Sequence, residues 1–431
     1  MLAALHSSLV TGDVHFLLGG MTSPRRIEEL DDYQRYCEGR LADPYPLFRR
    51  LRSEDPVHWC EPLNGWLVTR HDDVMAGFRD PRLSSDRISL SMNAMPEPLR
   101  TEMCPLGNHV SNWLGFTDPP KHTRMRGLIL KVFTPRLAEQ MGPRVEEIVN
   151  GLLDRSLPRG ELDFMADVAF PLPASVICEI LGIPMDYQDR FRRWAEDMLM
   201  FAGAVGPSIA KVAAPAHRSY MELTAYFREL TLDRRRTPRA DLLSALAAVE
   251  DEEGGLSEAE LMGLSVFLFI AGHETTVSLM GNGLLALLNH PGELDRLRRE
   301  PELLGSAVEE FLRFESPIQI ATRLPVENLV LRGKKILKGQ TVVLMLGAAN
   351  RDPERFADPD RLDVGRTENK HTAFGWGSHF CLGAPLARIE TQLALKLLLE
   401  RAPRLERAGE SLQWREDNNI RSLRALRVRV G

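Results

Sequence analysis

The stretch FGWGSHFCLG, residues 374–383, holds a cysteine close to a glycine and ends where a strong helical pattern begins. Pro385 suits the first turn of the helix that residues 384–403 predict, so the sulfur of Cys381 is expected near a helix N-terminus. Backbone N–H groups and the positive end of the helix dipole stabilise a thiolate at such a place. The stretch therefore indicates a thiol presented as a metal ligand, although a buried structural cysteine is the commoner role of a lone thiol.

The same stretch carries three glycines, Gly375, Gly377 and Gly383. Glycine adopts backbone conformations that other residues avoid, and it has no side chain to hold a ligand away. We therefore expect the loop to bend closely around the group that Cys381 binds.

Length and composition place the chain among large globular proteins. It has 431 residues, of which 44% are hydrophobic and 26% charged, enough to bury a sizeable core. With 54 Lys and Arg against 60 Asp and Glu, the net charge is -6, so the sequence lacks the basic excess that nucleic-acid binding requires. The cysteines are odd in number and widely spaced, which argues against a disulfide framework or a zinc cluster and favours a reducing, cytoplasmic setting. They are Cys37, Cys60, Cys104, Cys178 and Cys381.

The N-terminal stretch, residues 1–20, is moderately apolar, but polar residues interrupt it and no basic segment precedes it. We therefore expect neither export nor a membrane anchor, and we place the natural start at Met21, after which recognisable pattern begins. Because no repeat or long linker divides the chain, we expect an N-terminal extension over residues 1–42, poorly structured at its start, and one domain over residues 43–431.

Hydrophobic periodicity predicts a mainly α protein with small β-sheets, an α+β fold. Apolar residues recur at spacings of three and four through much of residues 120–316, whereas strand-like runs are short and scattered. The clearest helical segments are residues 136–157, 189–205 and 242–253, and the strand-like runs are residues 65–70, 341–347 and 423–430.

The longest predicted helix runs from Ser257 to about Asn289, opened by a capping box with Glu260 and closed by Pro291. At roughly 1.5 Å per residue it would span about 50 Å and cross the domain as a central helix. Its uninterrupted apolar part, residues 263–272, is about half as long as a membrane span requires, so we expect a buried core helix.

AGHETT, residues 271–276, lies in the middle of this helix and is unusually polar for a core position. Glycine loosens a helix, and a threonine side chain can hydrogen-bond back to a carbonyl and bend it. We expect a local opening there, although a polar bulge satisfied within the core is the simpler interpretation of this motif taken alone. Further along, Glu310 and Arg313 are three positions apart on one helical face and can pair, most commonly as a surface salt bridge.

The pattern F-G-x-G-x-H-x-C-x-G followed by APLARIE resembles the haem-thiolate loop of the cytochrome P-450 family, of the soluble bacterial type. The resemblance extends from about Asp43 to the end of the chain, and its motifs occur in the family's order. They are DPPKHTRMR (118–126), AGHETT (271–276), EEFLR (309–313), ANRDP (349–353) and the cysteine loop. The resemblance implies the P-450 fold, with haem b between the long helix and the loop and the Cys381 thiolate as axial ligand.

Several residues gain roles from this resemblance. Glu274 and Thr275 match the acid and the alcohol that relay protons to bound dioxygen, the co-substrate. The residues that match positions gripping the haem propionates are His122, Arg126, Arg323 and His379. Further haem-contacting positions are matched by Phe374, Gly375, Gly383, Ala271 and Gly272.

The resemblance also implies a structural role for the Glu310–Arg313 pair. In the family this pair is buried and braces the cysteine-loop region, where a downstream arginine joins it. We place that arginine at Arg361, which precedes Leu362 where the family usually has phenylalanine.

The implied activity is that of a monooxygenase that inserts one atom of O2 into a hydrophobic small molecule, by hydroxylation or epoxidation, in secondary metabolite biosynthesis. We expect electrons from a separate ferredoxin or flavodoxin with its NAD(P)H-dependent reductase, and a cytoplasmic monomer that binds neither membrane nor nucleic acid. A haem-thiolate enzyme that uses peroxide or couples carbon skeletons is an alternative, and so is a haem protein that binds a ligand without turnover.

The resemblance surrounds the substrate with mostly apolar residues, which indicates a hydrophobic molecule. They are Met92, Met95, Phe267, Leu268, Ile318, Ile320 and Ile420. Core packing is an equally good interpretation of each residue taken alone. The sequence leaves open whether the substrate is a macrolide, terpenoid, steroid, fatty acid or carrier-bound intermediate.

Overall fold

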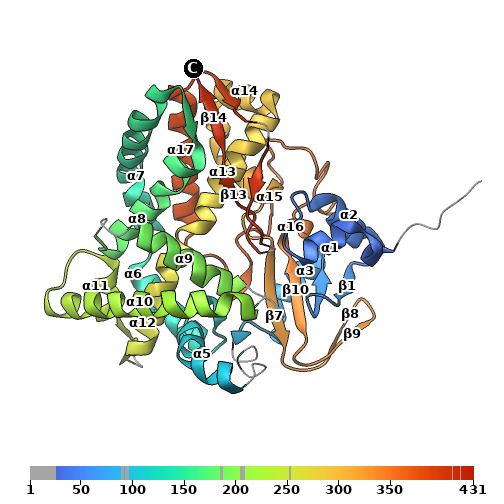
Figure 1. Cartoon of the computed structure of the whole chain (residues 1–431), viewed down its shortest axis with the longest axis vertical. Coiled ribbons are helices and arrows are strands. Elements are labelled where there is room, and N and C mark those ends of the chain that lie inside the picture. The colour runs from blue at the N-terminus through green and yellow to red at the C-terminus, as the bar shows by residue number, and fades with distance from the viewer. Residues whose placement is uncertain are drawn as a thin grey trace, which may run out of the picture.

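The computed structural model describes residues 26–88, 92, 97–184, 188–203, 209–251, 254–409, 411–417 and 419–431. Met95 and residues 1–25 of the expected N-terminal extension lie outside this part of the chain. Figure 1 shows a roughly triangular outline, with a helical mass on one side and a smaller region of strands and short helices on the other. The mainly α architecture with small sheets confirms the fold class expected from the sequence.

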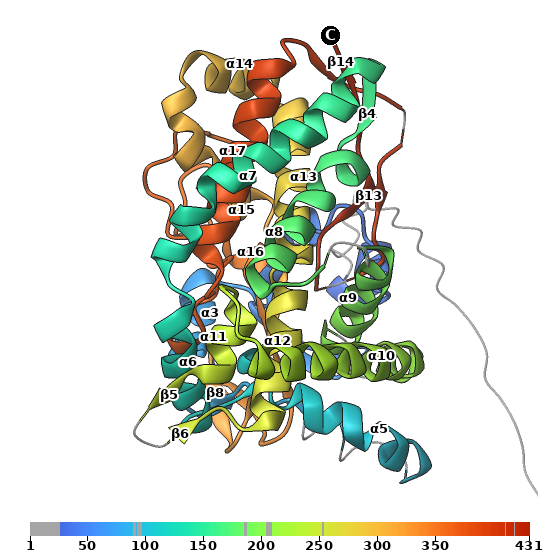
Figure 2. The ribbon, with the colours of Figure 1, turned by 90° about the vertical axis from the view of Figure 1, so that its left-hand side faces the viewer.

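The helical side is built around one large apolar core. Its helices are α5 (Glu97–Val110), α6 (Lys121–Val132), α7 (Pro135–Ser156), α8 (Pro171–Leu181), α9 (Gln188–Gly203), α10 (Ile209–Arg236), α11 (Leu242–Ala248), α12 (Glu258–Ala271), α13 (Glu274–Asn289), α14 (Pro291–Arg299), α15 (Leu304–Phe314) and α17 (Ala384–Arg401). In Figure 2, α9 and α10 lie against α12. The predicted helical segments correspond to α7, α9 and α11, but α11 is shorter than its pattern because residues 250–251 form β5 and pair with β6 (Gly254–Gly255).

The central helix begins as predicted. The side chain of Ser257 accepts a hydrogen bond from the N–H of Glu260, and the Glu260 carboxylate accepts one from the N–H of Ser257. By length and composition, Glu258–Asn289 could cross a membrane, but 78% of its apolar window is buried inside the protein. A buried core helix passes the same test, so the prediction of a core helix agrees with this placement.

The central helix is interrupted where the sequence predicts a local opening, because α12 ends at Ala271 and α13 begins at Glu274. Between them the backbone turns at Gly272 and His273, where φ and ψ of His273 are -106° and -74°. A side chain at Gly272 would be crowded, because its Cβ would lie 2.9 Å from the carbonyl oxygen of Leu268. The predicted local opening is therefore present and separates two helices.

The smaller side of the molecule is organised by a five-stranded sheet of order β1-β2-β10-β7-β3. The strands are β1 (Val57–Cys60), β2 (Gly65–Val68), β3 (Leu83–Ser84), β7 (Ile320–Pro325) and β10 (Thr341–Met345). A second apolar core lies here, between the sheet and the helices α1 (Asp31–Cys37), α2 (Tyr45–Glu54) and α16 (Leu346–Ala349). The helix α3 (His71–Arg79) contacts both α16 and β10, so this region is tied to the strands that border the cavity described below.

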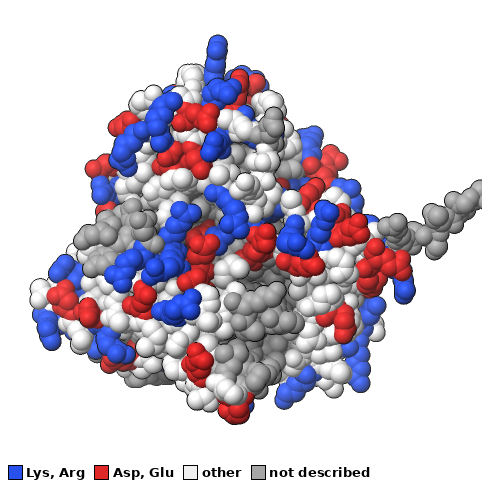
Figure 3. Space-filling model, in the orientation of Figure 1, with Lys and Arg blue, Asp and Glu red and all other residues white. Residues whose placement is uncertain are grey.

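The remaining strands are short. The C-terminal run forms β13 (Leu423–Ala425) and β14 (Arg427–Val430), and β14 lies between β11 (Leu405–Arg407) and β4 (Glu161–Asp163). The strands β8 (Leu329–Leu331) and β9 (Lys334–Ile336) form a hairpin, and β12 (Gln413–Trp414) pairs with β13. Each strand-like run predicted from the sequence therefore contains a strand. On the face shown in Figure 3, basic and acidic side chains are interspersed, in keeping with the near balance of charges in the sequence.

Candidate active site

A cavity of about 370 Å³ lies between the opening in the central helix and the cysteine loop. Its walls come from α6, α12, α13, β7, the cysteine loop and the start of α17. Most of the predicted site residues line it: Cys381, Thr275, His122, Arg126, Arg323, His379, Phe374, Gly375, Gly383, Ala271 and Gly272. The structure thus brings into one cavity residues that are spread over much of the sequence.

The cysteine loop owes its shape to glycine. Gly375 and Gly377 have φ of 68° and 71°, in the left-handed region that residues with a side chain avoid. The N–H of Cys381 donates to the carbonyl of Phe374 at 2.9 Å, which closes the loop. Helix α17 follows directly, with Gly383 as its N-cap and proline in its first turn, as the sequence predicts.

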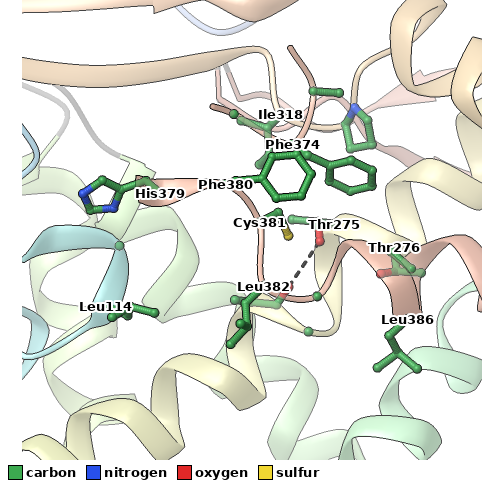
Figure 4. A pocket seen from close by; sticks show the side chains of 18 of the residues that line it. Leu114, Thr275, Thr276, Ile318, Phe374, His379, Phe380, Cys381, Leu382 and Leu386 are labelled. Carbon is green, nitrogen blue, oxygen red and sulfur yellow. Dashed lines mark hydrogen bonds between the residues drawn. The ribbon is translucent and has the colours of Figure 1, made fainter. Parts of the chain in front are cut away.

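This closure places the Cys381 sulfur in the cavity (Figure 4), together with Thr275 from the first turn of α13. Burial raises the pKa of the thiol, while hydrogen bonds from the N–H groups of Gly383 and Ala384 oppose the rise. A metal ion bound to the sulfur would remove its proton outright. Cys381 therefore offers one sulfur ligand, supported by the N–H groups of Gly383 and Ala384. The described residues of the cavity wall provide no second sulfur.

Two histidines and two arginines form one wall of the cavity. The rings of His122 and His379 lie 4.0 Å apart, and burial lowers the pKa of His122 and lowers that of His379 to about 3. Both ring nitrogens of His122 are buried and have no hydrogen-bond partner among the described residues. Arg126 donates to the carbonyl of Phe380, and Arg323 donates to that of Thr322.

Burial lowers the pKa of the half-buried Arg126 and lowers that of the buried Arg323 to about 10, since partial removal from water disfavours the charged guanidinium. Neither side chain forms an ion pair with a carboxylate of the described residues. Buried cations and imidazoles without anionic partners need an anion to neutralise them. A flat group that carries two carboxylates, as haem does, fits this cavity, in which these side chains could hold the carboxylates and Cys381 could bind the metal.

The predicted acid and alcohol take different positions. Thr275 lines the cavity, and its hydroxyl donates to the carbonyl of Ala271 at 3.2 Å, the dashed line in Figure 4. Glu274 is buried but does not belong to the described lining; its carboxylate accepts a hydrogen bond from Arg415 at 2.7 Å. Arg415 lies 141 positions further along the chain, and no sequence motif marks it.

The predicted ion pair behind the loop is present and fully buried. The guanidinium of Arg313 donates to both oxygens of Glu310, at 2.7 and 2.8 Å, and neither side chain is exposed. The third member is Arg366, whose Nε lies 3.2 and 3.1 Å from the same two oxygens. The prediction of Arg361 is wrong, because its side chain is 64% exposed and pairs with Asp363. Only the backbone carbonyl of Arg361 reaches the cluster, as an acceptor for Arg313.

The apolar prediction for the substrate region holds in part. A second lobe of about 210 Å³ shares several walls with the first and lies beside α12 and β7. Of the predicted apolar residues, those that line either space are Phe267, Leu268, Ile318 and Ile320. Met92 packs against Gly107 in the large core, and Ile420 forms a bridge with Ile318 behind the wall, so neither is part of the described lining.

Two charged residues of the described lining were not predicted. Arg87 borders the smaller lobe, where its guanidinium lies over the ring of Phe116 and donates to the carbonyl of Ala202. Glu390, on α17, borders the larger cavity, is 1% exposed, and has one carboxyl oxygen without a hydrogen-bond partner among the described residues. Burial raises the pKa of Glu390 well above its ordinary value, so its carboxyl is protonated more readily than a surface glutamate.

Comparison with known proteins agrees with this arrangement. The model of the Cytochrome P450 family matches residues 106–402. "Cytochrome P450 monooxygenase PikC" of Streptomyces venezuelae is 42% identical over 397 residues, covering 90% of this chain and 91% of that protein. "Vitamin D(3) 25-hydroxylase" of Pseudonocardia autotrophica is 41% identical over 396 residues, covering 90% and 94%.

Solved structures share the fold as well. The crystal structure of P450BioI in complex with hexadec-9Z-enoic acid ligated acyl carrier protein superposes with a TM-score of 0.85. It is 34% identical in sequence, and the match covers 93% of this chain and 100% of that one. The likeness therefore extends well beyond the segment that contains the cysteine loop.

Proposed function

The chain belongs to the cytochrome P450 family and is a haem-thiolate monooxygenase, and on this basis we propose which residues bind the haem, deliver protons and contact the substrate. Cys381 binds the haem iron, and His122, Arg126, Arg323 and His379 hold the propionates. The observation that carries this proposal is the single cavity in which the Cys381 sulfur faces Thr275 while the unpaired His122 and the two arginines form one wall.

Haem with a thiolate ligand would bind dioxygen after reduction and would favour cleavage of the O–O bond, so that one oxygen atom could enter the substrate. The chain's part is electrostatic and steric. The N–H groups of Gly383 and Ala384 hold negative charge on the Cys381 sulfur, and Phe374 and Leu386 exclude water from the cavity around it.

We assign proton delivery to Thr275 and Glu274. The Thr275 hydroxyl lies at the cavity surface and could pass a proton by exchanging its bond to the Ala271 carbonyl for one to a water or to the co-substrate in the cavity. Glu274 directly precedes Thr275 as the first residue of α13 and is buried, and its partner Arg415 contacts the half-exposed Glu196 at 3.1 Å. Glu274 therefore supplies protons to Thr275 from outside the cavity.

We propose a hydrophobic small molecule as substrate, held in the lobe bordered by Phe267, Ile318 and Ile320. The names of the relatives above refer to vitamin D3 and to a carrier-bound fatty acid, so both a fused-ring lipid and a long acyl chain belong in the first panel of ligands. Displacement of water by a fitting ligand is expected to change the spin state of the iron. Conversion of those ligands that produce the change would identify the position of attack.

Electrons come from a separate ferredoxin or flavodoxin with its NAD(P)H-dependent reductase in the cytoplasm. Support comes from the outer side of the cysteine loop, where Trp376 and Phe380 are 38% and 37% exposed. The guanidinium of Arg79 lies 5.3 Å from the Trp376 ring, so this surface is both aromatic and basic, which suits an acidic redox protein.

The test is the spectrum of the reduced carbon monoxide complex. Wild-type protein should give the band at the wavelength from which the family takes its name, and Cys381→Ser should lose it. Cys104→Ser is the matched control, because that thiol is exposed and lies away from the cavity lining. Retention of the band in Cys381→Ser, or its loss in the control alone, contradicts the assignment of Cys381.

A further inference from the structure

A second pair of sulfur atoms lies in the small β-rich region, apart from the haem cavity. The Sγ atoms of Cys37 and Cys60 are 3.6 Å apart, although 23 positions separate the two residues. Cys37 is the last residue of α1 and Cys60 the last residue of β1. Neither lines the cavity, so the monooxygenase reaction leaves this contact unexplained.

The surroundings make the pair reactive. Cys60 is fully buried in the second apolar core, whereas Cys37 is only half-buried at its edge, so a small solute can reach the pair from the side of Cys37. The hydrogen bond from the Cys37 thiol stabilises a thiolate on Cys60 and lowers the pKa of Cys60 to about 7. The same contact raises the pKa of Cys37, so the first proton leaves Cys60 and the second stays between the sulfurs.

Other roles fit this pair less well. Two sulfurs are too few for a structural zinc site, and no group of three or more His, Cys, Asp or Glu suited to a metal occurs among the described residues. The Tyr33 hydroxyl lies 3.1 Å from His58 Nε2 and also hydrogen-bonds Cys60, where it adds to the effect of Cys37 in lowering the pKa of that thiol. The pair is therefore a dithiol beside a tyrosine, with no further metal ligand grouped around it among the described residues.

We propose that Cys37 and Cys60 are a modification site, a dithiol that a hydroperoxide oxidises reversibly to an intramolecular disulfide. The Cys60 thiolate attacks the nearer peroxide oxygen and forms a sulfenic acid, while the distal oxygen leaves as hydroxide or water. The Cys37 sulfur then attacks the sulfenic sulfur, the S–S bond forms, and water leaves. Two thiols lose two protons and two electrons, and one hydrogen peroxide becomes two water molecules.

The geometry favours this product. An S–S bond is about 2.05 Å long, so the sulfurs have to approach by roughly 1.5 Å, which rotation about the Cα–Cβ bonds can supply. The bond would join the end of α1 to the end of β1 and close a loop that contains α2. Because a cross-link restricts the unfolded chain, we expect the oxidised protein to melt at a temperature higher by roughly 3–5 °C.

The experiment is peptide mapping of the haem-loaded enzyme after a brief exposure to hydrogen peroxide in small excess. Remaining thiols are alkylated under denaturing conditions, and the digest is searched for a Cys37–Cys60 cross-linked peptide. Wild type and Cys104→Ser should both give this peptide and the higher melting temperature, and dithiothreitol should remove both. Cys37→Ser should instead retain a sulfenic acid at Cys60 that dimedone traps.

The proposal is overturned if Cys37 and Cys60 are both recovered alkylated while the exposed Cys104 is oxidised. It is also overturned if the melting temperature rises equally in Cys37→Ser. Diamide, which converts dithiols to disulfides without peroxide, serves as the second oxidant and should give the same peptide. None of these measurements uses turnover or the carbon monoxide spectrum, so their outcome is independent of the proposed function.

Discussion

Arg415 and Glu274 form a buried ion pair directly behind the cavity wall, with 2.7 Å between Nη1 and Oε2. The side chain of Arg415 is 14% exposed and that of Glu274 is 4% exposed. On its other side Arg415 pairs with Glu196 at 3.1 Å, and Glu196 is about half exposed. Glu274, Arg415 and Glu196 thus form a chain of three charges that leads from the position before Thr275 to the surface of α9.

We expect Arg415→Gln to destabilise the protein by about 3–5 kcal/mol, because it leaves the Glu274 carboxylate buried without its cation. Glu196→Gln is the control, since loss of a half-exposed partner costs about 0–1 kcal/mol. Thermal unfolding of the two variants measures the difference. Equal melting temperatures would mean that Glu274 does not depend on Arg415, and partial recovery in the double variant Glu274→Gln/Arg415→Gln would confirm the coupling.

Thr275→Ala removes the hydroxyl that lies at the cavity surface directly after Glu274. Haem binding and the ligand-induced spin change should persist, because neither uses this hydroxyl. The yield of oxidised product per NADPH should fall by roughly ten-fold or more, with the electrons recovered as hydrogen peroxide. Thr275→Ser, which keeps the hydroxyl, should restore most of the yield. Normal coupling in Thr275→Ala would refute the proton-delivery role.

Arg366→Ala and Arg361→Ala compare two neighbouring arginines of one loop. Arg366 contacts both oxygens of the fully buried Glu310, so we expect its loss to cost about 2–4 kcal/mol and to weaken haem retention in the adjoining cysteine loop. Arg361 is exposed and pairs with Asp363, and its loss should cost less than about 1 kcal/mol. Melting temperature and haem content measure both effects. A larger loss in Arg361→Ala than in Arg366→Ala would support the placement at Arg361 that the sequence predicted.

The comparison of these arginines shows where sequence reasoning fails. The spacing of Glu310 and Arg313 is helical, so their contact follows from a repeat of 3.6 residues, and the capping box at Ser257 is equally local. The segment that carries Arg361 and Arg366 has no regular repeat. Which arginine reaches Glu310 there depends on the turn at Asp363, whose N–H donates to the Glu310 carboxylate at 3.0 Å.

Contacts over long separations were missed for the same reason. The cysteine loop and the wall of His122 and Arg323 were predicted because they match positions shared by the family, and the opening at Gly272 was predicted because glycine and threonine weaken a core helix. No motif marks Arg415, and no spacing links Cys37 to Cys60, whose contact depends on how α1 packs against the edge of the sheet. A buried polar residue that lies outside a recognised motif can be assigned a partner only from the structure.

Glu390 is such a residue, and it gives a prediction about pH. Its carboxyl is 1% exposed on α17, and burial alone raises its pKa well above the ordinary value of 4.5. In the unfolded chain the group releases its proton near pH 4.5, whereas in the folded protein it keeps the proton to higher pH. The folded state therefore binds more protons than the unfolded state. As the pH rises above 4.5, the stability of the protein falls by up to about 1.4 kcal/mol per pH unit.

Glu390→Gln replaces the carboxyl by a neutral amide of the same shape and removes this dependence. The melting temperature of the variant relative to wild type should rise as pH increases from about 5.5 to 8, by roughly 1–2 °C per unit until the folded-state pKa is reached.

Glu309→Gln is the opposite control. Arg388 and His371 overcome its burial and lower the pKa of Glu309 to about 2, so its stabilisation is present above pH 4.5 and is lost only in acid. That variant should be less stable than wild type at every pH in this range. If the difference for Glu390→Gln does not change with pH, Glu390 is ionised in the folded protein, and a cation or solvent must reach it.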